Sequence, residues 1–317
     1  MLILHESDVR SLLTMQALIL EMERALQAVS AGEVVQPVRV MVPIDGHRGY
    51  LGSMPAYGGG LLGAKLVTWF PGNQGVPTHH ALVVLFRPGT GEPLAIMDGR
   101  LITEMRTAAV SAAATKMLAR PDASVLAILG AGVQAGSHLE ALRLVREFRD
   151  IRVWSPHRAS AFARRFGVRL ARSAEDAVRG ADVIVVATGS KTPVLAGEWL
   201  SPGAHVNAVG APRPDWRELD DGVLRRAKLF VESREAAVRE SGDVIAAGTI
   251  AAEIGEVIAG TKAGRQSGEE ITLFKSVGIA VEDLASGGLV YRGWIAEHPD
   301  AAAASASGSK TILDRTR

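Results

Sequence analysis

The segment Gly130-Ala131-Gly132-Val133-Gln134-Ala135 constrains the fold of this chain more than any other stretch. It fits the pattern G-x-G-x-x-A and stands between the apolar run 125–129 and a segment with helical spacing. In such a turn the first glycine bends the chain, the second lets the backbone approach a pyrophosphate, and the small Ala135 lets helix and strand pack closely. A glycine-rich turn can also be purely structural, but its placement at a helix N-terminus favours a dinucleotide site made by these six residues.

Strands and helices alternate around this motif. Strand patterns occur at 125–129, 151–154, 181–187, 205–209 and 228–231, with helical patterns at 133–149 and 159–166. Alternation of this kind indicates a doubly wound parallel sheet of the Rossmann type. We therefore predict an α/β fold class for this part of the chain.

The region before the motif has a different texture. One helix or two abutting helices are expected over 8–30, followed by short apolar strands at 38–42, 49–54, 64–69, 81–86 and 93–97. Pro and Gly punctuate these strands, which is typical of an antiparallel meander. An alanine-rich helix should follow over 103–118. The sequence thus predicts a β-rich α+β domain ahead of the Rossmann-type domain, and a low-complexity mobile tail from about residue 300.

Composition narrows the function classes. The 317 residues carry Lys+Arg 35 against Asp+Glu 34 and few aromatics, which argues against a nucleic-acid partner. There is no cysteine, so disulfides, thiolate zinc sites and cysteine nucleophiles are excluded, and we predict no metal site. Neither a signal peptide nor a membrane span is expected, which makes the cytoplasm the expected location and a membrane an unexpected partner.

Cofactor choice should be decided after the strand 151–154. An acidic residue there would bind the ribose 2′-OH of NAD, but the chain has no carboxylate at this point. Ser155, His157 and Arg158 could instead donate hydrogen bonds to a 2′-phosphate, so we predict NADPH, with NADH as a weaker cofactor. An exposed arginine at the start of a helix is the alternative interpretation of Arg158. Thr107 and Thr188 are further predicted cofactor contacts.

Three cations lie within or beside apolar stretches of the first domain. They are Arg39, Lys65 and Arg106, and burial of such groups is costly unless they are paired. Salt-bridged or exposed roles remain open for each of them. The residue pattern alone does not bring them together.

A set of separated motifs occurs in a fixed order along the chain. They are Gln36-Pro37-Val38-Arg39, His47-Arg48-Gly49-Tyr50-Leu51-Gly52, Met54-Pro55-Ala56-Tyr57, Lys65-Leu66-Val67-Thr68, Met97-Asp98-Gly99, Arg106-Thr107-Ala108-Ala109, the glycine motif, Arg213-Pro214-Asp215-Trp216-Arg217-Glu218-Leu219-Asp220-Asp221, Phe274-Lys275-Ser276 and Ala280-Val281-Glu282-Asp283. Together they resemble the ornithine cyclodeaminase/mu-crystallin family. The likeness extends to about residue 295.

The resemblance implies that the two domains have different functions. Residues 1–115 with 287–317 would bind substrate and form a homodimer through their sheet, 116–286 would bind the dinucleotide, and the active site would lie between them. Arg39 and Arg106 match positions that hold a substrate carboxylate, and an arginine fork suits that geometry. Lys65 should have a lowered pKa, because desolvation and the two neighbouring arginines both disfavour its ammonium form. It is the predicted proton donor or hydrogen-bonding group for the imine nitrogen. His79 matches a histidine in the mu-crystallin branch, and we predict substrate contact there, although a structural role is the alternative.

Two departures from the family argue against ornithine cyclisation. Cyclodeaminases carry an Asp shortly after the Asn-Ala-Val-Gly strand, where this chain has Pro212, and usually a Glu where this chain has Gly52. Neither residue can replace a carboxylate. Both losses favour simple hydride transfer.

The resulting prediction is an NAD(P)H-dependent reductase of cyclic ketimine carboxylates. The imino acid substrates would be Δ1-piperideine-2-carboxylate and Δ1-pyrroline-2-carboxylate, and the products L-pipecolate and L-proline; a broader imine reductase activity is included. The alternatives are an alanine-type amino-acid dehydrogenase, an ornithine cyclodeaminase, and a non-catalytic protein that binds NADPH and an aromatic carboxylate.

Overall fold

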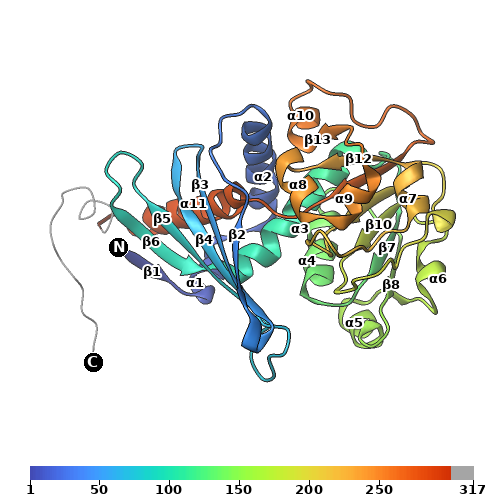
Figure 1. Cartoon of the computed structure of the whole chain (residues 1–317), viewed down its shortest axis with the longest axis horizontal. Coiled ribbons are helices and arrows are strands. Elements are labelled where there is room, and N and C mark those ends of the chain that lie inside the picture. The colour runs from blue at the N-terminus through green and yellow to red at the C-terminus, as the bar shows by residue number, and fades with distance from the viewer. Residues whose placement is uncertain (301–317) are drawn as a thin grey trace.

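The computed structural model describes residues 1–300, and the predicted mobile tail in 301–317 lies outside the described residues. Within residues 1–300 the chain forms two β-sheets, each with its own helices, which stand side by side (Figure 1). One sheet is mainly antiparallel and the other is parallel throughout. The predicted fold class, a Rossmann-type parallel sheet plus a β-rich α+β part, is confirmed.

The first sheet contains six strands in the order β1-β6-β5-β4-β3-β2. Their bounds are β1 (Leu2–Leu4), β2 (Val40–Ile44), β3 (Gly49–Gly58), β4 (Leu61–Trp69), β5 (His79–Phe86) and β6 (Pro93–Asp98). Strands β2 to β6 form the predicted antiparallel meander, and β1 pairs with β6 in parallel. The sequence did not predict β1, because a three-residue edge strand is too short to show a periodicity.

Helices cover one face of the first sheet. They are α1 (Glu6–Leu12), α2 (Met15–Ser30), α3 (Gly99–Leu118) and α11 (Ala280–Glu297). Helix α11 packs on β3, β4 and β5, and α3 packs on β5. Side chains alternate along each strand, so Met54 of β3, Lys65 of β4 and Val83 of β5 all point to this covered face and are buried.

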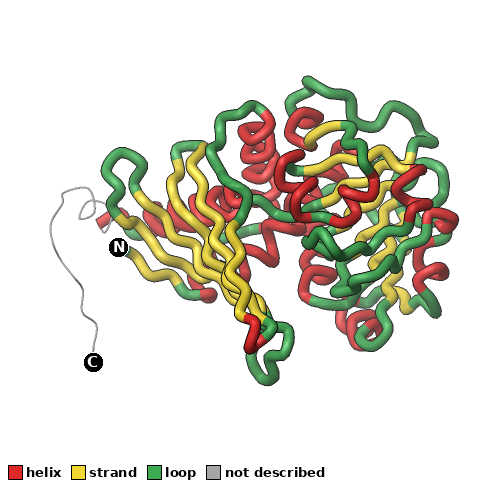
Figure 2. The backbone as a smooth tube through the Cα atoms, in the orientation of Figure 1, coloured by secondary structure: helices red, strands yellow, loops and turns green. Residues whose placement is uncertain are grey.

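The opposite face of the first sheet is apolar and exposed. In Figure 2 its strands lie in front of the helices that cover the other face. Val40, Leu66 and Leu82 lie in one row across β2, β4 and β5 and are 60%, 40% and 48% exposed. An apolar row of this kind on an open sheet is a candidate contact surface.

The second sheet contains eight parallel strands in the order β13-β12-β14-β11-β10-β7-β8-β9. Their bounds are β7 (Val125–Leu129), β8 (Asp150–Trp154), β9 (Arg169–Leu170), β10 (Val183–Val186), β11 (His205–Ala208), β12 (Ala227–Val231), β13 (Ala252–Glu253) and β14 (Ile271–Lys275). The surrounding helices are α4 (Val133–Arg143), α5 (Ala159–Phe166), α6 (Ala174–Val178), α7 (Asp221–Arg226), α8 (Arg234–Glu240), α9 (Gly242–Ala247) and α10 (Ile254–Ile258), with a short 3-10 turn at Gly197–Trp199. A second 3-10 turn, Asp45–His47, lies between β2 and β3 of the first sheet.

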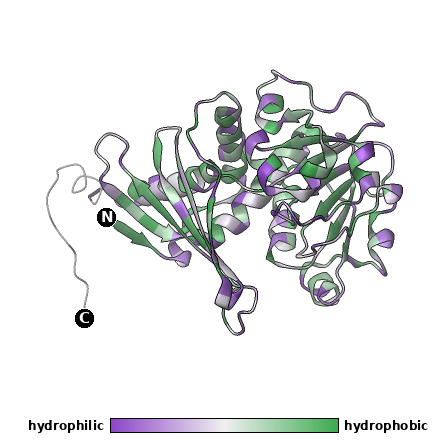
Figure 3. Cartoon of the chain, viewed as in Figure 1, coloured by the Kyte–Doolittle hydropathy of each residue, from purple (hydrophilic) through white to green (hydrophobic). Residues whose placement is uncertain are grey.

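The parallel strands are apolar because helices cover both faces of their sheet. Figure 3 shows hydrophobic residues along these strands, while hydrophilic residues gather on the outer helices. Every residue of β10 is buried, for example. The carboxyl ends of such strands form the edge at which doubly wound proteins bind ligands.

One long helix connects the halves of the molecule. Helix α3 begins against β5 of the first sheet and ends beside β11 and β14 of the second. The predicted domain boundaries at 115/116 and 286/287 both fall inside helices, in α3 and in α11. Helix α3 is thus a continuous connection between the two halves, whereas α11 packs on helices and strands of the first half.

Several helix bounds differ from the sequence predictions for local reasons. Of the two arrangements expected over 8–30, two abutting helices form, because Thr14 leaves the helical conformation and its side chain caps α2. Helix α3 begins at Gly99, since Asp98 accepts the N–H groups of Arg100 and Leu101. Helix α4 ends at Arg143, well before residue 149, because the chain must turn to enter β8. No helix within residues 1–300 is long and apolar enough to span a membrane.

Candidate active site

A pocket of about 590 Å³ lies where the two sheets face each other. Residues from both halves line it, and seven of them are predicted site residues: Arg39, Lys65, His79, Arg106, Thr107, Gln134 and Thr188. The predicted substrate residues and part of the predicted cofactor set therefore share one pocket.

Lys65 is buried in the wall of this pocket, with a side chain 2% exposed. Its Nζ lies 2.6 Å from Oδ2 of Asp283, which is in the first turn of α11. Burial lowers the pKa of Lys65 to about 8; the nearby charges of Arg106 and Arg39 also lower it, while Asp283 raises it. The predicted direction of this pKa shift is confirmed, with desolvation as the largest cause.

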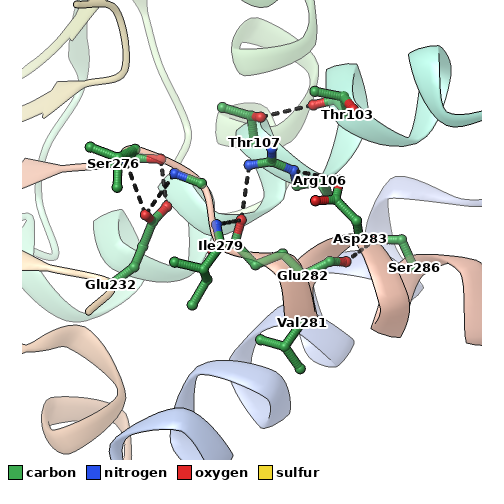
Figure 4. Close-up of polar contacts among 12 residues, drawn as sticks. Thr103, Arg106, Thr107, Glu232, Ser276, Ile279, Val281, Glu282, Asp283 and Ser286 are labelled. Atoms are coloured by element: carbon green, nitrogen blue, oxygen red, sulfur yellow. Dashed lines mark hydrogen bonds and ion pairs between the residues drawn. The ribbon is translucent and has the colours of Figure 1, made fainter. Parts of the chain in front are cut away.

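Arg106 projects from α3 against the same turn of α11 (Figure 4). Its Nε lies 3.1 Å from Oδ1 of Asp283, and its Nη1 lies 2.9 Å from Oε2 of Glu282. Burial by itself lowers the pKa of Arg106, but the two carboxylates outweigh burial and raise it. The guanidinium is thus a fixed cation, and its Nη2 makes no hydrogen bond to any residue in the described range.

The position of the Arg106 guanidinium depends on the absence of a side chain at Gly278. This residue has φ +75°, and a Cβ there would lie 2.6 Å from Nη1 of Arg106. Any side chain would therefore strain the backbone and displace the arginine. Glycine at this position keeps the pocket side of the guanidinium open.

Arg39 precedes β2 and reaches across to the second half of the molecule. Its Nε donates to Oε1 of Glu240 at 2.7 Å, and its Nη2 donates to the carbonyl oxygens of Val277 and Gly278 at 2.6 Å each. The Nη1 group makes no hydrogen bond within residues 1–300. Arg39 therefore ties the two halves together and keeps donors available at the pocket wall.

His79 opens β5 and lines the pocket near these cations. Its backbone belongs to the β4–β5 ladder, and its imidazole makes no hydrogen bond to another side chain or backbone group among residues 1–300. Burial and the charges of Lys65 and Arg106 lower the pKa of His79 to about 4. The imidazole is therefore neutral at pH 7 and adds no further positive charge.

Glu232 shapes the loop that passes beneath the arginines. It follows β12, and its carboxylate accepts hydrogen bonds from the Ser276 hydroxyl and from the N–H groups of Val277 and Gly278 at 3.0 and 2.9 Å (Figure 4). The carbonyl groups of the same loop accept from Arg39. One buried carboxylate thus fixes a loop that fixes a cation.

The acidic partners of the three cations were not predicted as site residues. Glu282 and Asp283 belong to the motif Ala280-Val281-Glu282-Asp283. Acidic residues in the first turn of a helix are common, however, because the helix dipole favours negative charge there. Glu240 is the last residue of α8, and no sequence motif around it marks it as a site residue. The one available signal was the prediction that the buried cations need partners.

The glycine motif adopts the geometry of a phosphate-binding turn. Gly130 has φ +116°, and a Cβ there would lie 2.2 Å from the carbonyl oxygen of Ala187. Gly132 is the N-cap residue of α4, and no side chain accepts hydrogen bonds from the first N–H groups of this helix. Ala135 in the first turn is fully buried. The first N–H groups of this eleven-residue helix are therefore available to an anion, so the residues fit a dinucleotide pyrophosphate.

The predicted 2′-phosphate residues lie beside this turn. Ser155, His157 and Arg158 follow β8, and the Gly130 N–H donates to the carbonyl of Trp154 at 2.9 Å, which places the two strand ends together. Arg158 is exposed at the start of α5. None of the three lines the pocket itself, nor do Gly130, Ala131, Gly132, Val133 and Ala135.

Thr188 and Thr107 lie on the cofactor side of the pocket. The N–H and hydroxyl groups of Thr188 both donate to Oε1 of the buried Glu218, at 2.8 and 2.5 Å. Burial raises the pKa of Glu218 to about 7. The Thr107 hydroxyl donates to the carbonyl of Thr103 at 2.8 Å, and the amide of Gln134 reaches the same carbonyl at 3.5 Å. These bonds set the side chains in fixed orientations.

The far wall of the pocket is aromatic. The Arg213 guanidinium carbon lies 3.9 Å from the centre of the Tyr50 ring, and its Nη1 donates to the Tyr50 hydroxyl at 2.8 Å. Trp69 and Trp216 flank the same guanidinium. Pro212 lines the pocket next to this wall.

Fold and site together define a class of protein. It is an α/β protein that holds a dinucleotide at the end of a parallel sheet and faces it with a cationic pocket for a small anion. Within residues 1–300, no group of three His, Asp or Glu side chains is placed to hold a metal ion.

The chain belongs to the ornithine cyclodeaminase/mu-crystallin family, whose model matches residues 1–298. It is 53% identical to the ketimine reductase mu-crystallin of Mus musculus over 272 residues, covering 83% of this chain and 86% of that protein. It resembles the Δ1-pyrroline-2-carboxylate reductase of Thermococcus litoralis, solved with NADH and L-proline, with a TM-score of 0.89, 38% identity and coverage of 94% and 98%. It also resembles an archaeal alanine dehydrogenase dimer with bound NAD, with a TM-score of 0.88, 37% identity and coverage of 93% and 96%.

Proposed function

We propose that this protein reduces cyclic ketimine carboxylates, namely Δ1-piperideine-2-carboxylate and Δ1-pyrroline-2-carboxylate, to L-pipecolate and L-proline with NADPH. The observation that carries the proposal is the single pocket in which Arg39, Lys65 and Arg106 face the start of the dinucleotide helix at Gln134. The similarity of the chain to a ketimine reductase and to a Δ1-pyrroline-2-carboxylate reductase supports the same reaction.

The proposed roles follow from the free hydrogen-bond donors. Arg39 and Arg106 each have a guanidinium nitrogen with no partner in the described residues, and a substrate carboxylate bound there would receive charge-assisted hydrogen bonds. This fixes the neighbouring C=N group close to Lys65. The ammonium of Lys65 donates a proton to the imine nitrogen, and neutral His79 contributes a hydrogen bond to the substrate.

The nicotinamide cofactor, when bound, supplies the hydride that reduces the imine carbon. The glycine motif and the N-terminus of α4 would hold its pyrophosphate, and Ser155, His157 and Arg158 its 2′-phosphate. Thr107 and Thr188 would bound the nicotinamide side of the pocket.

The test of the proposed function is oxidation of NADPH with each cyclic imine, run beside NADH and beside pyruvate with ammonia. Rapid oxidation with a cyclic imine supports the proposal, and the better ring size names the substrate. Activity only with pyruvate and ammonia would make the protein an alanine-type dehydrogenase, like its archaeal relative. Tight cofactor binding without any turnover would point to a non-catalytic binding protein.

Ornithine cyclisation is disfavoured by the pocket itself. Pro212 offers no carboxylate at the position of the cyclodeaminase Asp. At Gly52, a Cβ would lie 2.9 Å from both the Met41 sulfur and a methyl group of Val67, so a glutamate would not fit without displacing them. Release of ammonia from ornithine would contradict this interpretation.

The preference for NADPH gives a separate prediction. Arg158→Ala removes a charged donor from the proposed 2′-phosphate site, and the loss should lower selectivity for NADPH over NADH by about tenfold to a hundredfold. The measurement is kcat/KM with each cofactor. Arg164→Ala is the matched control, since this exposed arginine of α5 has no hydrogen-bond partner within residues 1–300 except Ser160. An unchanged selectivity ratio in Arg158→Ala would place recognition of the 2′-phosphate elsewhere.

We also propose a homodimer formed through the open face of the first sheet, and assign dimerisation and substrate binding to residues 1–115 with 287–317. The exposed apolar row of Val40, Leu66 and Leu82 supports this, as does the dimeric state of the archaeal relative. A cytoplasmic location stays a prediction.

The variant Leu82→Asp should convert this dimer to monomers, because it buries a charge within an apolar interface. Sedimentation velocity measures the change. Leu170→Asp, at an equally exposed leucine on β9 of the other sheet, should remain dimeric. A monomeric wild type, or a dimeric Leu82→Asp, would contradict the proposed interface.

A further inference from the structure

Asp283 contacts both the proposed proton donor and the proposed carboxylate clamp. Its Oδ2 lies 2.6 Å from Nζ of Lys65, and its Oδ1 lies 3.1 Å from Nε of Arg106. The carboxylate is fully buried in the first turn of α11 and does not line the pocket. It therefore sits behind the two cations and does not touch the substrate space.

The groups that face Lys65 come from four segments of the chain. The charges of Arg106 on α3 and Arg39 before β2 disfavour its ammonium form, and so does burial, whereas His79 on β5 is neutral at pH 7. Asp283 on α11 is the one group within residues 1–300 that forms an ion pair with Lys65.

Nearby carboxylates have other partners. Glu282 pairs with Arg106, Glu240 pairs with Arg39, and Glu232 accepts from the backbone of the loop before α11. None of the three is paired with Lys65 in the described part of the chain. The protonation of Lys65 therefore depends on one carboxylate.

Imine reduction needs that proton. As hydride adds to the imine carbon, a new N–H bond must form at the imine nitrogen, and one Nζ–H bond of the Lys65 ammonium breaks to supply it. The amine left behind regains a proton from solvent after product leaves. A lysine that entered the cycle as a neutral amine would have no acidic proton to give.

We propose that Asp283 is a positioning residue that keeps Lys65 protonated and orients its ammonium toward the imine nitrogen. The proposal rests on the proposed ketimine reduction. Asp283 itself stays ionised: burial raises its pKa, but Arg106 and Lys65 outweigh burial and lower it. It can therefore act as a permanent negative charge across the working pH range.

The test is the pH profile of Asp283→Asn, which keeps the shape of the side chain and removes its charge. Wild-type kcat should be level at low pH and fall as pH rises through the Lys65 pKa of about 8. Loss of a contacting opposite charge should move this alkaline midpoint down by about one to three pH units. Rates near pH 6 should thus be closer to wild type than rates near pH 8, while cofactor affinity is unchanged.

The matched control is Asp182→Asn. This carboxylate also bonds an arginine, Arg120, and backbone N–H groups, but near the amino ends of β7 and β10. It should lower thermal stability without moving the alkaline midpoint. An unmoved midpoint in Asp283→Asn, with a uniformly lower rate, would overturn the proposal and leave Asp283 a structural residue.

Two further measurements keep the proposal testable. NMR titration of 15N-lysine-labelled protein measures the protonation of Lys65 without turnover. If the wild-type protein were inactive on imines, the proposed reaction would be refuted, but the NMR comparison of wild type with Asp283→Asn would still test the role of Asp283. If Asp283→Asn does not fold, Asp283→Glu retains the charge and should keep an alkaline midpoint near that of wild type. A downward shift in Asp283→Glu would overturn the proposal.

Discussion

Replacement of Lys65 by methionine should lower kcat for imine reduction by roughly 10²- to 10⁴-fold, the range that a positioned general acid contributes. Methionine keeps the length and much of the volume of the side chain, so the wall of the pocket should remain filled. Asp283 retains Arg106 as an ion-pair partner in this variant, which avoids an unpaired buried charge. The measurement is kcat under saturating NADPH and imine, together with the dissociation constant for NADPH.

Lys116→Met provides the matched control. Lys116 also pairs with a carboxylate, Glu23, but it is 45% exposed and lies outside the pocket. It should leave kcat unchanged, because exposed ion pairs contribute little. A Lys65→Met enzyme with normal kcat would remove Lys65 from the chemistry, and an equal loss of NADPH affinity would make the defect one of cofactor binding.

The nucleotide half of the fold could be predicted because its signals are local. The glycine motif, the apolar run before it and the helix after it are contiguous, and the structure places them as β7, a tight turn and α4. The meander was predictable for the same reason, since the strands follow one another along the chain. The predictions that were wrong also have local causes. Helix α4 ends before its predicted end because the chain turns toward β8. Strand β1 was not predicted because three residues are too few to show an alternation of apolar and polar side chains.

Among the charged groups of the site, the cations could be predicted and their acidic partners could not. Lys65 in β4 and Arg106 in α3 stand out because a charge within an apolar stretch is unusual. Their carboxylate partner Asp283 is on α11, far along the chain, and looks like an ordinary acidic residue of a helix start. Sequence periodicity places a residue on a face of its own element, whereas this ion pair depends on how α11 packs against β4.

The arrangement of charges explains why the pocket can hold three cations. Each of Arg39, Lys65 and Arg106 has a buried or half-buried carboxylate behind it, from α8 or α11. Without those partners, burial of the cations would cost several kcal/mol each. The partners also fix the side chains before substrate arrives, so less conformational entropy is lost on binding.

Arg106→Lys should raise KM for a cyclic imine by about tenfold to a hundredfold, because lysine keeps the positive charge but has no planar guanidinium that can hold Glu282 and Asp283 and still present Nη2 to the substrate carboxylate. The charge matters for folding: Arg106→Ala would leave Glu282 and Asp283 buried with one cation fewer, a change that costs about 3–5 kcal/mol. Lysine avoids most of that penalty. The effect should therefore appear in substrate binding while the variant remains folded.

The matched control for this variant is Arg120→Lys, since Arg120 also pairs with a carboxylate, Asp182, but outside the pocket. Its KM should equal that of wild type. A second readout separates the roles of the two cations: Arg106→Lys should weaken inhibition by the product imino acid in parallel with the rise in KM, because product and substrate share the carboxylate. An unchanged KM with a lower kcat would instead assign Arg106 to the proton-transfer chemistry beside Lys65, and an unchanged KM and kcat would remove it from the site.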